Sequence, residues 1–232
     1  MKSLFITATD TNVGKTLVGA AIAAFLRSKK INVGVFKPCE SGCSKNERGE
    51  LIPADALFLK QMSASSDSLE EINPYRFAAP LAPGLAAQLE NKEIDLEKIK
   101  RQFLEIEARH EITLVEGAGG LMVPLGKAQN NVHLIQKLEI PVLLIVRNGL
   151  GTLNHTLLSL AHLEREKVEV LGLILNQTQA EVDTSAVYNL ETLREWTSVP
   201  VLGVFPFIQK PFRVSVLAEE AKKILLEHSF WS

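Results

Sequence analysis

The sequence predicts an α/β fold in which a mostly parallel sheet is covered by helices on both faces. Three observations lead to this prediction. Short apolar runs rich in β-branched residues alternate along the chain with segments of helical periodicity. The apolar runs are continuous, as in strands that are buried on both faces, and do not alternate with polar residues. A helical segment joins each run to the next, which is the connection that parallel strands require.

Six strands are expected, with helices between them. The strand candidates are residues 3–7, 32–36, 111–115, 141–146, 169–175 and 200–204. Residues 95–109 and 152–165 carry apolar side chains at helical spacing, and Asp95 can cap the first of these helices. Residues 63–84 are rich in serine and proline and predict a long loop-rich insertion, which in a compact domain is often part of a site.

The composition is that of one globular domain. With 232 residues, the chain is long enough to fold as a single domain, residues 1–232, without a disulfide or a metal ion. Hydrophobic residues make up 46% and charged residues 22%, which is ordinary for a soluble protein. The formal charge of −2 argues against a nucleic-acid partner, because proteins that bind nucleic acids usually have a basic excess.

Neither a membrane span nor a signal peptide is expected. The longest apolar run, residues 140–146, is far too short to cross a bilayer. Residues 1–3 lead straight into the first strand and leave no room for a signal peptide. Cys39 and Cys43 have no further zinc ligands nearby, so we interpret them as free thiols of a cytoplasmic protein.

The loop between the first strand and the first helix, residues 8–16, is the most informative segment. It reads Ala-Thr-Asp-Thr-Asn-Val-Gly-Lys-Thr, with Gly14 directly before Lys15 and Thr16. At such a helix start, backbone N–H groups converge on an anion, the lysine reaches the outer phosphates, and the threonine hydroxyl takes Mg²⁺. Thr9 stands where the usual pattern has a glycine. The strand before the loop and the helix after it favour a fold of the P-loop NTPase type.

Three more glycine-bearing polar segments follow the next strands. They are residues 37–42, 116–120 and 150–155. In open parallel sheets, ligands bind beyond the carboxyl ends of the strands. All four segments are therefore expected to share one edge of the sheet and to form one site.

Lys37 leaves the second strand beside the predicted phosphate site, and Pro38 fixes the turn after it. A second cation here would stabilise the charge that spreads over a transferred phosphoryl group. The alternative is a surface lysine at a strand end. Ser41 has two interpretations as well, since it can hydrogen-bond a substrate or stabilise its own turn.

Two carboxylates are candidate metal ligands. Glu116 ends an almost fully apolar strand, where a carboxylate is poorly solvated unless it is paired, and Mg²⁺ is the natural partner in a phosphate site. A salt bridge to a basic side chain is the alternative. Asp55 lies at an expected helix start, so metal ligation and a favourable helix dipole, worth about 0.3–1 kcal/mol, both explain it.

Asn176 ends the fifth strand, and its amide offers the donor and acceptor that an adenine edge requires. Pro206 and Phe207 follow the last strand and can supply an apolar wall for a base. Asparagines after strands are also common turn formers, so a structural role for Asn176 stays open. The five histidines have no metal spacing and no nucleophile partner, and we interpret them as solvated or packed.

In combination, these motifs resemble the dethiobiotin synthetase family. The resemblance runs from residue 4 to about residue 207. It is carried by residues 9–16, Lys37-Pro38 with Ser41-Gly42, residues 54–56, 80–83 and 116–120, and Leu150-Gly151 with Asn154-His155. Phosphate-loop ATPases of the cell-division type usually have an additional lysine early in the loop, which this chain lacks.

The resemblance implies an ATP- and Mg²⁺-dependent ligase. In the family, CO₂ forms a carbamate on one amine of 7,8-diaminononanoate (7,8-diaminopelargonate). ATP phosphorylates the carbamate to a mixed anhydride, and the second amine closes the ring of dethiobiotin with loss of phosphate. The family also implies a homodimer with the site near the interface. A partitioning or switch-type P-loop ATPase is the alternative, since it too would bind ATP and Mg²⁺.

The resemblance further implies roles for the matching residues. Nucleotide phosphates would be held by Thr11, Asn12, Val13, Gly14, Lys15 and Thr16. Mg²⁺ would be ligated by Thr16, Asp55 and Glu116, and the catalytic residues would be Lys15 and Lys37. The diamine or its carbamate would contact Ser41, Gly117, Ala118 and Gly119. The base would lie against Asn176, Pro206 and Phe207, and the substrate carboxylate of the partner subunit's site against Leu150, Gly151 and Asn154.

Overall fold

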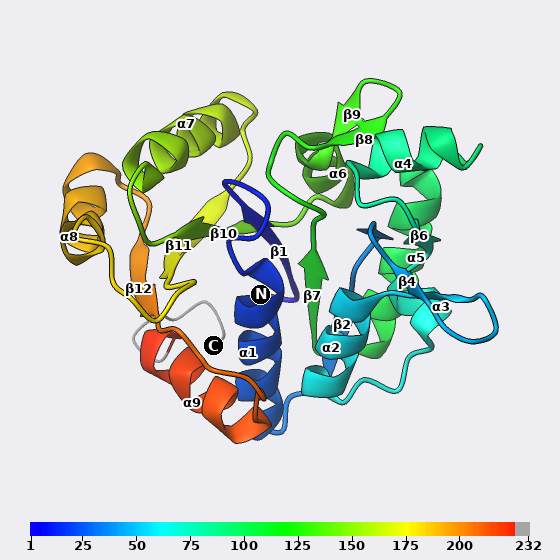
Figure 1. Ribbon diagram of the computed structural model, residues 1–232, viewed down its shortest axis with the longest axis horizontal. Helices are drawn as coiled ribbons and strands as arrows, with labels where there is room; N and C mark the ends of the chain where they lie inside the picture. The colour runs from blue at the N-terminus through cyan, green and yellow to red at the C-terminus, as the bar shows by residue number, and fades with distance from the viewer. Residues whose placement is uncertain (226–232) are drawn as a thin grey trace.

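A computed structural model describes residues 1–225 and contains a central six-stranded sheet (Figure 1). All neighbouring strands are parallel, in the order β12-β11-β10-β1-β7-β2. Their bounds are β1 (Ser3–Ala8), β2 (Val33–Phe36), β7 (Ile112–Glu116), β10 (Val142–Arg147), β11 (Val170–Asn176) and β12 (Val201–Phe205). The six predicted strands are confirmed, each within one residue at either end. The predicted α/β class is confirmed with them.

The remaining regular structure of the described chain consists of helices and short strands. The helices are α1 (Lys15–Ser28), α2 (Ala54–Ser63), α3 (Leu69–Ile72), α4 (Pro83–Leu89), α5 (Leu96–Arg109), α6 (Asn131–Leu138), α7 (Thr152–Arg165), α8 (Ala186–Trp196) and α9 (Val214–Leu225). The short strands are β3 (Cys39–Glu40), β4 (Ser44–Lys45), β5 (Leu51–Ile52), β6 (Tyr75–Arg76), β8 (Pro124–Gly126) and β9 (Gln129–Asn130). As predicted, Asp95 caps α5, because its side chain accepts hydrogen bonds from the N–H groups of Glu97 and Lys98.

The helices form one layer on each face of the sheet. On one face, α1 lies between α2 and α9 and packs against both (Figure 1). The buried part of α1 is almost continuously apolar and rich in alanine, because this helix is covered by the sheet and by two helices. The other face is covered by α5 and α6 over one half of the sheet and by α7 and α8 over the other. The layers leave the carboxyl ends of the strands for the connecting loops.

The segment between α2 and α4 is the predicted loop-rich insertion, and its mostly irregular course is confirmed. Its short strand β6 pairs in parallel with β3, and β3 follows β2 of the main sheet after two residues. Asn73 is buried and donates a hydrogen bond of 2.6 Å to the backbone carbonyl of Lys37. The insertion therefore fixes the chain that follows β2, where Lys37 and Ser41 lie.

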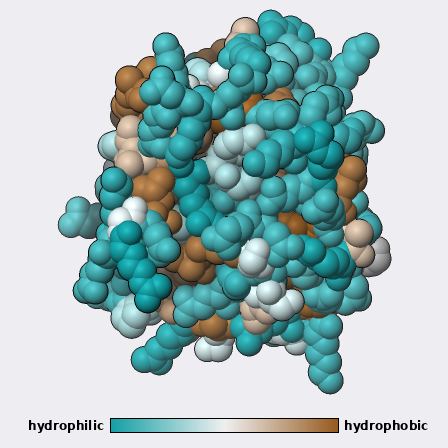
Figure 2. All heavy atoms as spheres, turned by 90° about the vertical axis from the view of Figure 1, so that its right-hand side faces the viewer, coloured by the Kyte–Doolittle hydropathy of each residue, from teal (hydrophilic) through white to brown (hydrophobic). Residues whose placement is uncertain are grey.

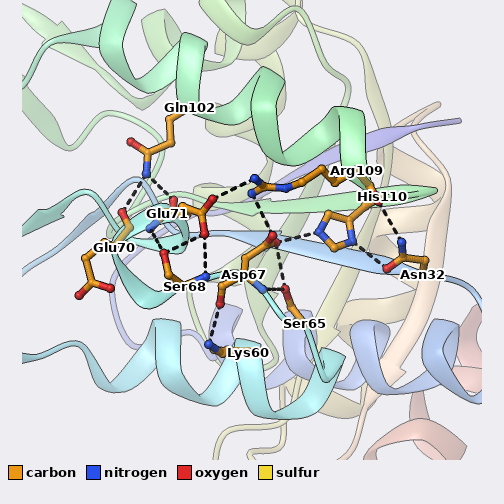
Figure 3. Close-up of polar contacts among 10 residues, drawn as sticks. All are labelled: Asn32, Lys60, Ser65, Asp67, Ser68, Glu70, Glu71, Gln102, Arg109 and His110. Atoms are coloured by element: carbon orange, nitrogen blue, oxygen red, sulfur yellow. Dashed lines mark hydrogen bonds and ion pairs between the residues drawn. The ribbon is translucent and has the colours of Figure 1, made fainter.

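A polar cluster around the buried side chains of Asp67 and His110 lies at the amino-terminal ends of the strands, where β2 and β7 begin (Figure 3). We call Asn32, Ser65, Asp67, Arg109 and His110 the Asp67 cluster. One oxygen of Asp67 lies 2.7 Å from His110 Nε2 and accepts a hydrogen bond of 2.9 Å from Ser65. The other oxygen lies 2.9 Å from Arg109, and His110 Nδ1 lies 2.8 Å from Asn32 Oδ1. These contacts join the segment after α2 to the end of α5 and to the start of β2.

The face on which α4, α5 and the β4–β5 hairpin lie is mostly hydrophilic, with apolar side chains in small groups (Figure 2). A hollow of about 830 Å³ on this side is lined by basic and acidic side chains, among them Arg76, Lys98, Glu70 and Glu93. None of the predicted site residues lines it. Within residues 1–225, no helix is both long enough and apolar enough to cross a membrane.

Candidate functional site

The loops after β1, β2 and β7 and the start of α2 enclose a cavity of about 430 Å³. Because the strands are parallel, these segments emerge at the same edge, as predicted, but the fourth predicted segment, residues 150–155, does not line the cavity. The cavity is lined by Thr11, Asn12, Gly14, Lys15, Thr16, Lys37, Cys39, Glu40, Ser41, Asp55, Glu116, Ala118 and Gly119. Eleven of the thirteen lining residues belong to the predicted site, the exceptions being Cys39 and Glu40.

The loop after β1 has the conformation of an anion cradle. Gly14 precedes α1 with a φ of 92°, in the left-handed region that favours glycine. Within residues 1–225 no side chain caps α1, so the N–H groups of its first turn are free for a ligand. A Cβ atom on Gly14 would lie 2.1 Å from the side-chain nitrogen of Asn176, so only glycine fits here. The start of α1 therefore offers N–H groups that can bind an anion.

Lys37 is buried, with its side chain 3% exposed, and contacts two carboxylates. Its ammonium group lies 2.5 Å from Glu116 Oε1 and 3.0 Å from Asp55 Oδ2. Burial acts to lower the pKa of Lys37, but the two carboxylates outweigh it and raise this pKa above its usual value. Lys37 is thus a permanently charged cation on the cavity wall and not a surface lysine.

Lys15 is also buried and lines the cavity, but its situation is the reverse. Among residues 1–225, its ammonium group has no hydrogen-bond or ion-pair partner. Burial and the nearby charge of Lys37 lower the pKa of Lys15 to about 8. A cation that is desolvated and repelled by its neighbour favours the arrival of an anion.

The oxygen-bearing side chains meet beside these lysines. The hydroxyl of Thr16 donates a hydrogen bond of 2.8 Å to Glu116 Oε1. Glu116 Oε2 is buried and has no hydrogen-bond partner within residues 1–225. The side chain of Asp55 is 43% exposed at the cavity. Burial acts to raise the pKa of its carboxyl, but the charge and hydrogen bond of Lys37 outweigh burial, and the pKa lies below its usual value. A buried carboxylate oxygen without a partner can be satisfied by a bound cation.

Mg²⁺ usually keeps several waters and takes one or two carboxylates together with substrate phosphates. Thr16, Asp55 and Glu116 provide such a set, whereas a site made by protein alone needs more ligands. Within the described chain, no three His, Cys, Asp or Glu side chains gather closely enough to hold a metal ion by themselves. The donors therefore fit Mg²⁺ in company with a bound phosphate.

The glycine run after β7 is held from behind by Asn131. The fully buried amide of Asn131 donates hydrogen bonds of 2.8 Å to the carbonyl oxygens of Ala118 and Gly120. A Cβ atom on Gly120 would come within 3.2 Å of the backbone of Asp10, so glycine allows the run to approach the phosphate loop closely. Sequence reasoning missed Asn131, because asparagine at a helix start reads as an ordinary cap.

Several predicted residues lie outside the cavity wall. Val13 is buried, and Gly117 packs against Phe5. Asn176 is buried and donates a hydrogen bond of 2.8 Å to the carbonyl of Val13, while its own oxygen has no partner among residues 1–225. The others that do not line the cavity are Leu150, Gly151, Asn154, Pro206 and Phe207. Asn176 thus supports the loop between β1 and α1, and its side-chain oxygen is buried without a partner among residues 1–225.

A family model described as an AAA domain matches residues 2–211. An ATP-dependent dethiobiotin synthetase of Thermodesulfovibrio yellowstonii is 41% identical over an alignment of 212 residues, and the match covers 88% of each chain. The chain belongs to the ATP-dependent dethiobiotin synthetase family. Another dethiobiotin synthetase, from Bacillus subtilis, is 38% identical and covers 94% of this chain and 92% of its own. The family resemblance read from the motifs is confirmed.

Solved structures agree with the fold of this dethiobiotin synthetase family member. The MinC:MinD cell division complex of Aquifex aeolicus matches with a TM-score of 0.57 and 15% identity, over 95% of this chain and 86% of that chain. A ParA family ATPase of Chlorobium tepidum matches with a TM-score of 0.54 and 13% identity, over 98% and 94%. At these identities the likeness concerns the fold alone, and it confirms the predicted P-loop NTPase type.

Proposed function

We propose that this protein converts 7,8-diaminononanoate, CO₂ and ATP into dethiobiotin, ADP and phosphate. The observation that carries the proposal is the pair of buried ammonium groups, Lys15 and Lys37, which line one cavity together with Asp55 and Glu116. Membership of the dethiobiotin synthetase family supplies the reaction, and the cavity supplies the charges that the reaction needs.

In this proposal, the triphosphate of ATP lies at the start of α1. The loop from Thr11 to Gly14 surrounds the phosphates with N–H groups, and Lys15 gains the anionic partner that it lacks in the empty protein. Mg²⁺, held by Thr16, Asp55 and Glu116, neutralises phosphate charge when it is bound. Lys37 faces the same cavity and stabilises the charge that develops on the transferred phosphoryl group.

The chemistry then runs in three steps. One amine of the substrate attacks CO₂ and loses a proton, which gives a carbamate. A carbamate oxygen attacks the γ-phosphorus of ATP, and ADP leaves. The second amine attacks the carbonyl carbon of this mixed anhydride, and phosphate leaves as the ring closes. Ring closure between oriented groups gains up to roughly 7–11 kcal/mol from proximity.

Ser41 and the backbone of Gly117, Ala118 and Gly119 are the proposed contacts of the diamine or its carbamate. Ser41, Ala118 and Gly119 line the cavity next to the two lysines, which supports this assignment. The adenine base is assigned to Asn176 with Pro206 and Phe207. The buried oxygen of Asn176, which has no partner within the described residues, supports it, as does the 42% exposure of Phe207.

A homodimer is part of the proposal. Met122 and Leu158 are more than half exposed and line one groove with Thr9 and Asp10, directly beside the phosphate loop. Leu150, two residues before α7, is 86% exposed. An interface over these apolar side chains would let Leu150, Gly151 and Asn154 reach the substrate carboxylate in the partner subunit's site. The proposed compartment is the cytoplasm, in keeping with the free cysteines Cys39 and Cys43.

The decisive experiment follows labelled bicarbonate into a cyclic urea. With ATP, Mg²⁺ and 7,8-diaminononanoate present, label is expected in dethiobiotin, and phosphate release is expected to depend on both the diamine and bicarbonate. Omission of either carbon substrate is the control. Phosphate release that is the same with and without them would contradict the proposal and indicate a switch-type ATPase.

A further inference from the structure

Glu40 is a buried carboxylate on the cavity wall that the proposed reaction does not use. It lies in the short strand β3, three residues after Lys37. Its Oε1 atom accepts a hydrogen bond of 2.9 Å from the N–H of Asp55, and its Oε2 atom accepts one of 3.0 Å from the N–H of Ala56. Both carboxylate oxygens therefore bind consecutive N–H groups in the first turn of α2.

These two contacts replace a cap that α2 lacks. The residue before the helix is Pro53, whose side chain makes no capping hydrogen bond. The first N–H groups of a helix have no partner within the helix and carry partial positive charge. A carboxylate that accepts two of them forms charge-assisted bonds, which are shorter and stronger than neutral ones. Glu40 thus holds the start of α2 from a neighbouring segment.

The backbone of Glu40 is itself fixed. Its carbonyl oxygen accepts a hydrogen bond of 2.9 Å from the N–H of Phe77, and β3 pairs with β6. Asp55 is consequently held at two points by one short segment. Glu40 binds its backbone N–H, and Lys37 binds its side chain at 3.0 Å.

We propose that Glu40 is a positioning residue, which sets the place of Asp55 in the Mg²⁺ site by anchoring the first turn of α2. The inference rests on the proposed role of Asp55 as a metal ligand. Because both oxygens of Glu40 are already engaged with N–H groups, its task is to orient Asp55 and not to ligate the metal. Partners of this kind behind a metal ligand typically change metal affinity or activity about 10–100-fold when they are replaced.

The test measures metal binding directly. Mn²⁺ replaces Mg²⁺ as an electron paramagnetic resonance probe, and the full-length protein is titrated in the presence of a non-hydrolysable ATP analogue. Glu40→Gln keeps the size of the side chain but places an amide NH₂ against a backbone N–H. Mn²⁺ binding is expected to weaken about tenfold, while the affinity for the analogue without metal stays within about twofold, since the metal-free phosphate contacts at α1 are untouched.

Asp95→Asn is the matched control. Asp95 also accepts hydrogen bonds from two N–H groups at a helix start, in α5, and it does not line the cavity. This variant is expected to lower the melting temperature without changing Mn²⁺ affinity. Glu40→Asp carries the test if Glu40→Gln does not fold, because it keeps the charge and only draws the carboxylate back by one methylene group.

Asp55→Asn distinguishes a failure of the inference about Glu40 from a failure of the metal assignment. If Asp55→Asn weakens Mn²⁺ binding and a folded Glu40 variant does not, the inference is overturned while the proposed function stands. If Asp55→Asn leaves Mn²⁺ binding unchanged, the metal assignment itself fails and the role of Glu40 fails with it. Weakening by both variants, with no further weakening in the double variant, supports the inference.

Discussion

The Asp67 cluster and the cavity lie at opposite ends of the strands, and the buried polar atoms of the two regions are satisfied to different degrees. In the Asp67 cluster, both carboxylate oxygens of Asp67 and both ring nitrogens of His110 have partners (Figure 3). In the cavity, the buried Oε2 atom of Glu116 has no partner within residues 1–225, and the pKa of Lys15 is lowered by burial and by the charge of Lys37.

The difference separates a structural role from a binding role. A closed network leaves nothing for a ligand to contact, and loss of any member leaves the others buried and unpaired. An open cluster contains buried polar atoms without protein partners, and a ligand can provide those partners. Variants in the two clusters should therefore affect different measurements.

The largest effect is expected from Lys15→Met. Loss of a charged contact to phosphate costs about 3 kcal/mol, so nucleotide affinity should fall roughly a hundredfold or more. The melting temperature of the empty protein should stay the same or rise, because a desolvated cation next to Lys37 is removed. Isothermal titration calorimetry and thermal unfolding measure the two quantities. Unchanged nucleotide binding would remove the phosphate-loop assignment.

Asp67→Asn should give the opposite result. Removal of the charge of Asp67 leaves the buried His110 without its carboxylate, while Arg109 keeps its ion pair with Glu71, and a buried polar group left without its partner costs about 1–3 kcal/mol. The free energy of unfolding in urea should fall by about this amount, while kcat and the KM for ATP stay unchanged. Glu139→Gln is the control, since it breaks an exposed ion pair with Lys100, and surface ion pairs of this kind contribute little to stability. A loss of kcat in folded Asp67→Asn would refute the separation of roles.

Glu116→Gln tests the orphaned oxygen. The amide keeps the volume but replaces one carboxylate oxygen with a donor, so the Mg²⁺ concentration for half-maximal activity should rise about tenfold. A metal titration identical to that of the unaltered protein would show that Glu116 is structural. The cavity residues would then resemble the Asp67 cluster in having a structural role.

The smallest effect concerns pH. The pKa of Lys15 in the empty protein is about 8, and bound phosphates favour its charged form. Nucleotide binding therefore takes up a proton, and affinity should fall about twofold between pH 7 and pH 8 and more steeply above. Calorimetry in buffers of different ionisation enthalpy detects the proton. Lys15→Met should show no such proton uptake, and equal uptake by both proteins would assign it to another group.

The sequence predicted what depends on local pattern. The strands are short apolar runs, and the phosphate loop from Thr11 to Thr16 is contiguous, so both could be read directly. Lys37 and Glu116 could be placed because strand ends in a parallel sheet share an edge. The family resemblance added Asp55, for which the local signal had left two interpretations open.

Contacts between distant segments could not be predicted. Asp67 and His110 are 43 positions apart in the chain, and neither has a neighbour that announces the other. Glu40 looked unremarkable because its partners are backbone N–H groups, which every residue possesses. The asparagine at the end of β11, Asn176, was assigned to the base from its side-chain chemistry, but its support of the Val13 carbonyl depends on how closely β11 approaches the loop.

The contact between Asn176 and Val13 links the proposed base site to the proposed phosphate loop. Asn176, the residue proposed to contact the base, also donates a hydrogen bond of 2.8 Å to the carbonyl oxygen of Val13 in the proposed phosphate loop. A poorly fitting base that displaces this amide would also disturb the loop on which phosphoryl transfer depends. Selection among nucleotides would then show up in turnover as well as in affinity.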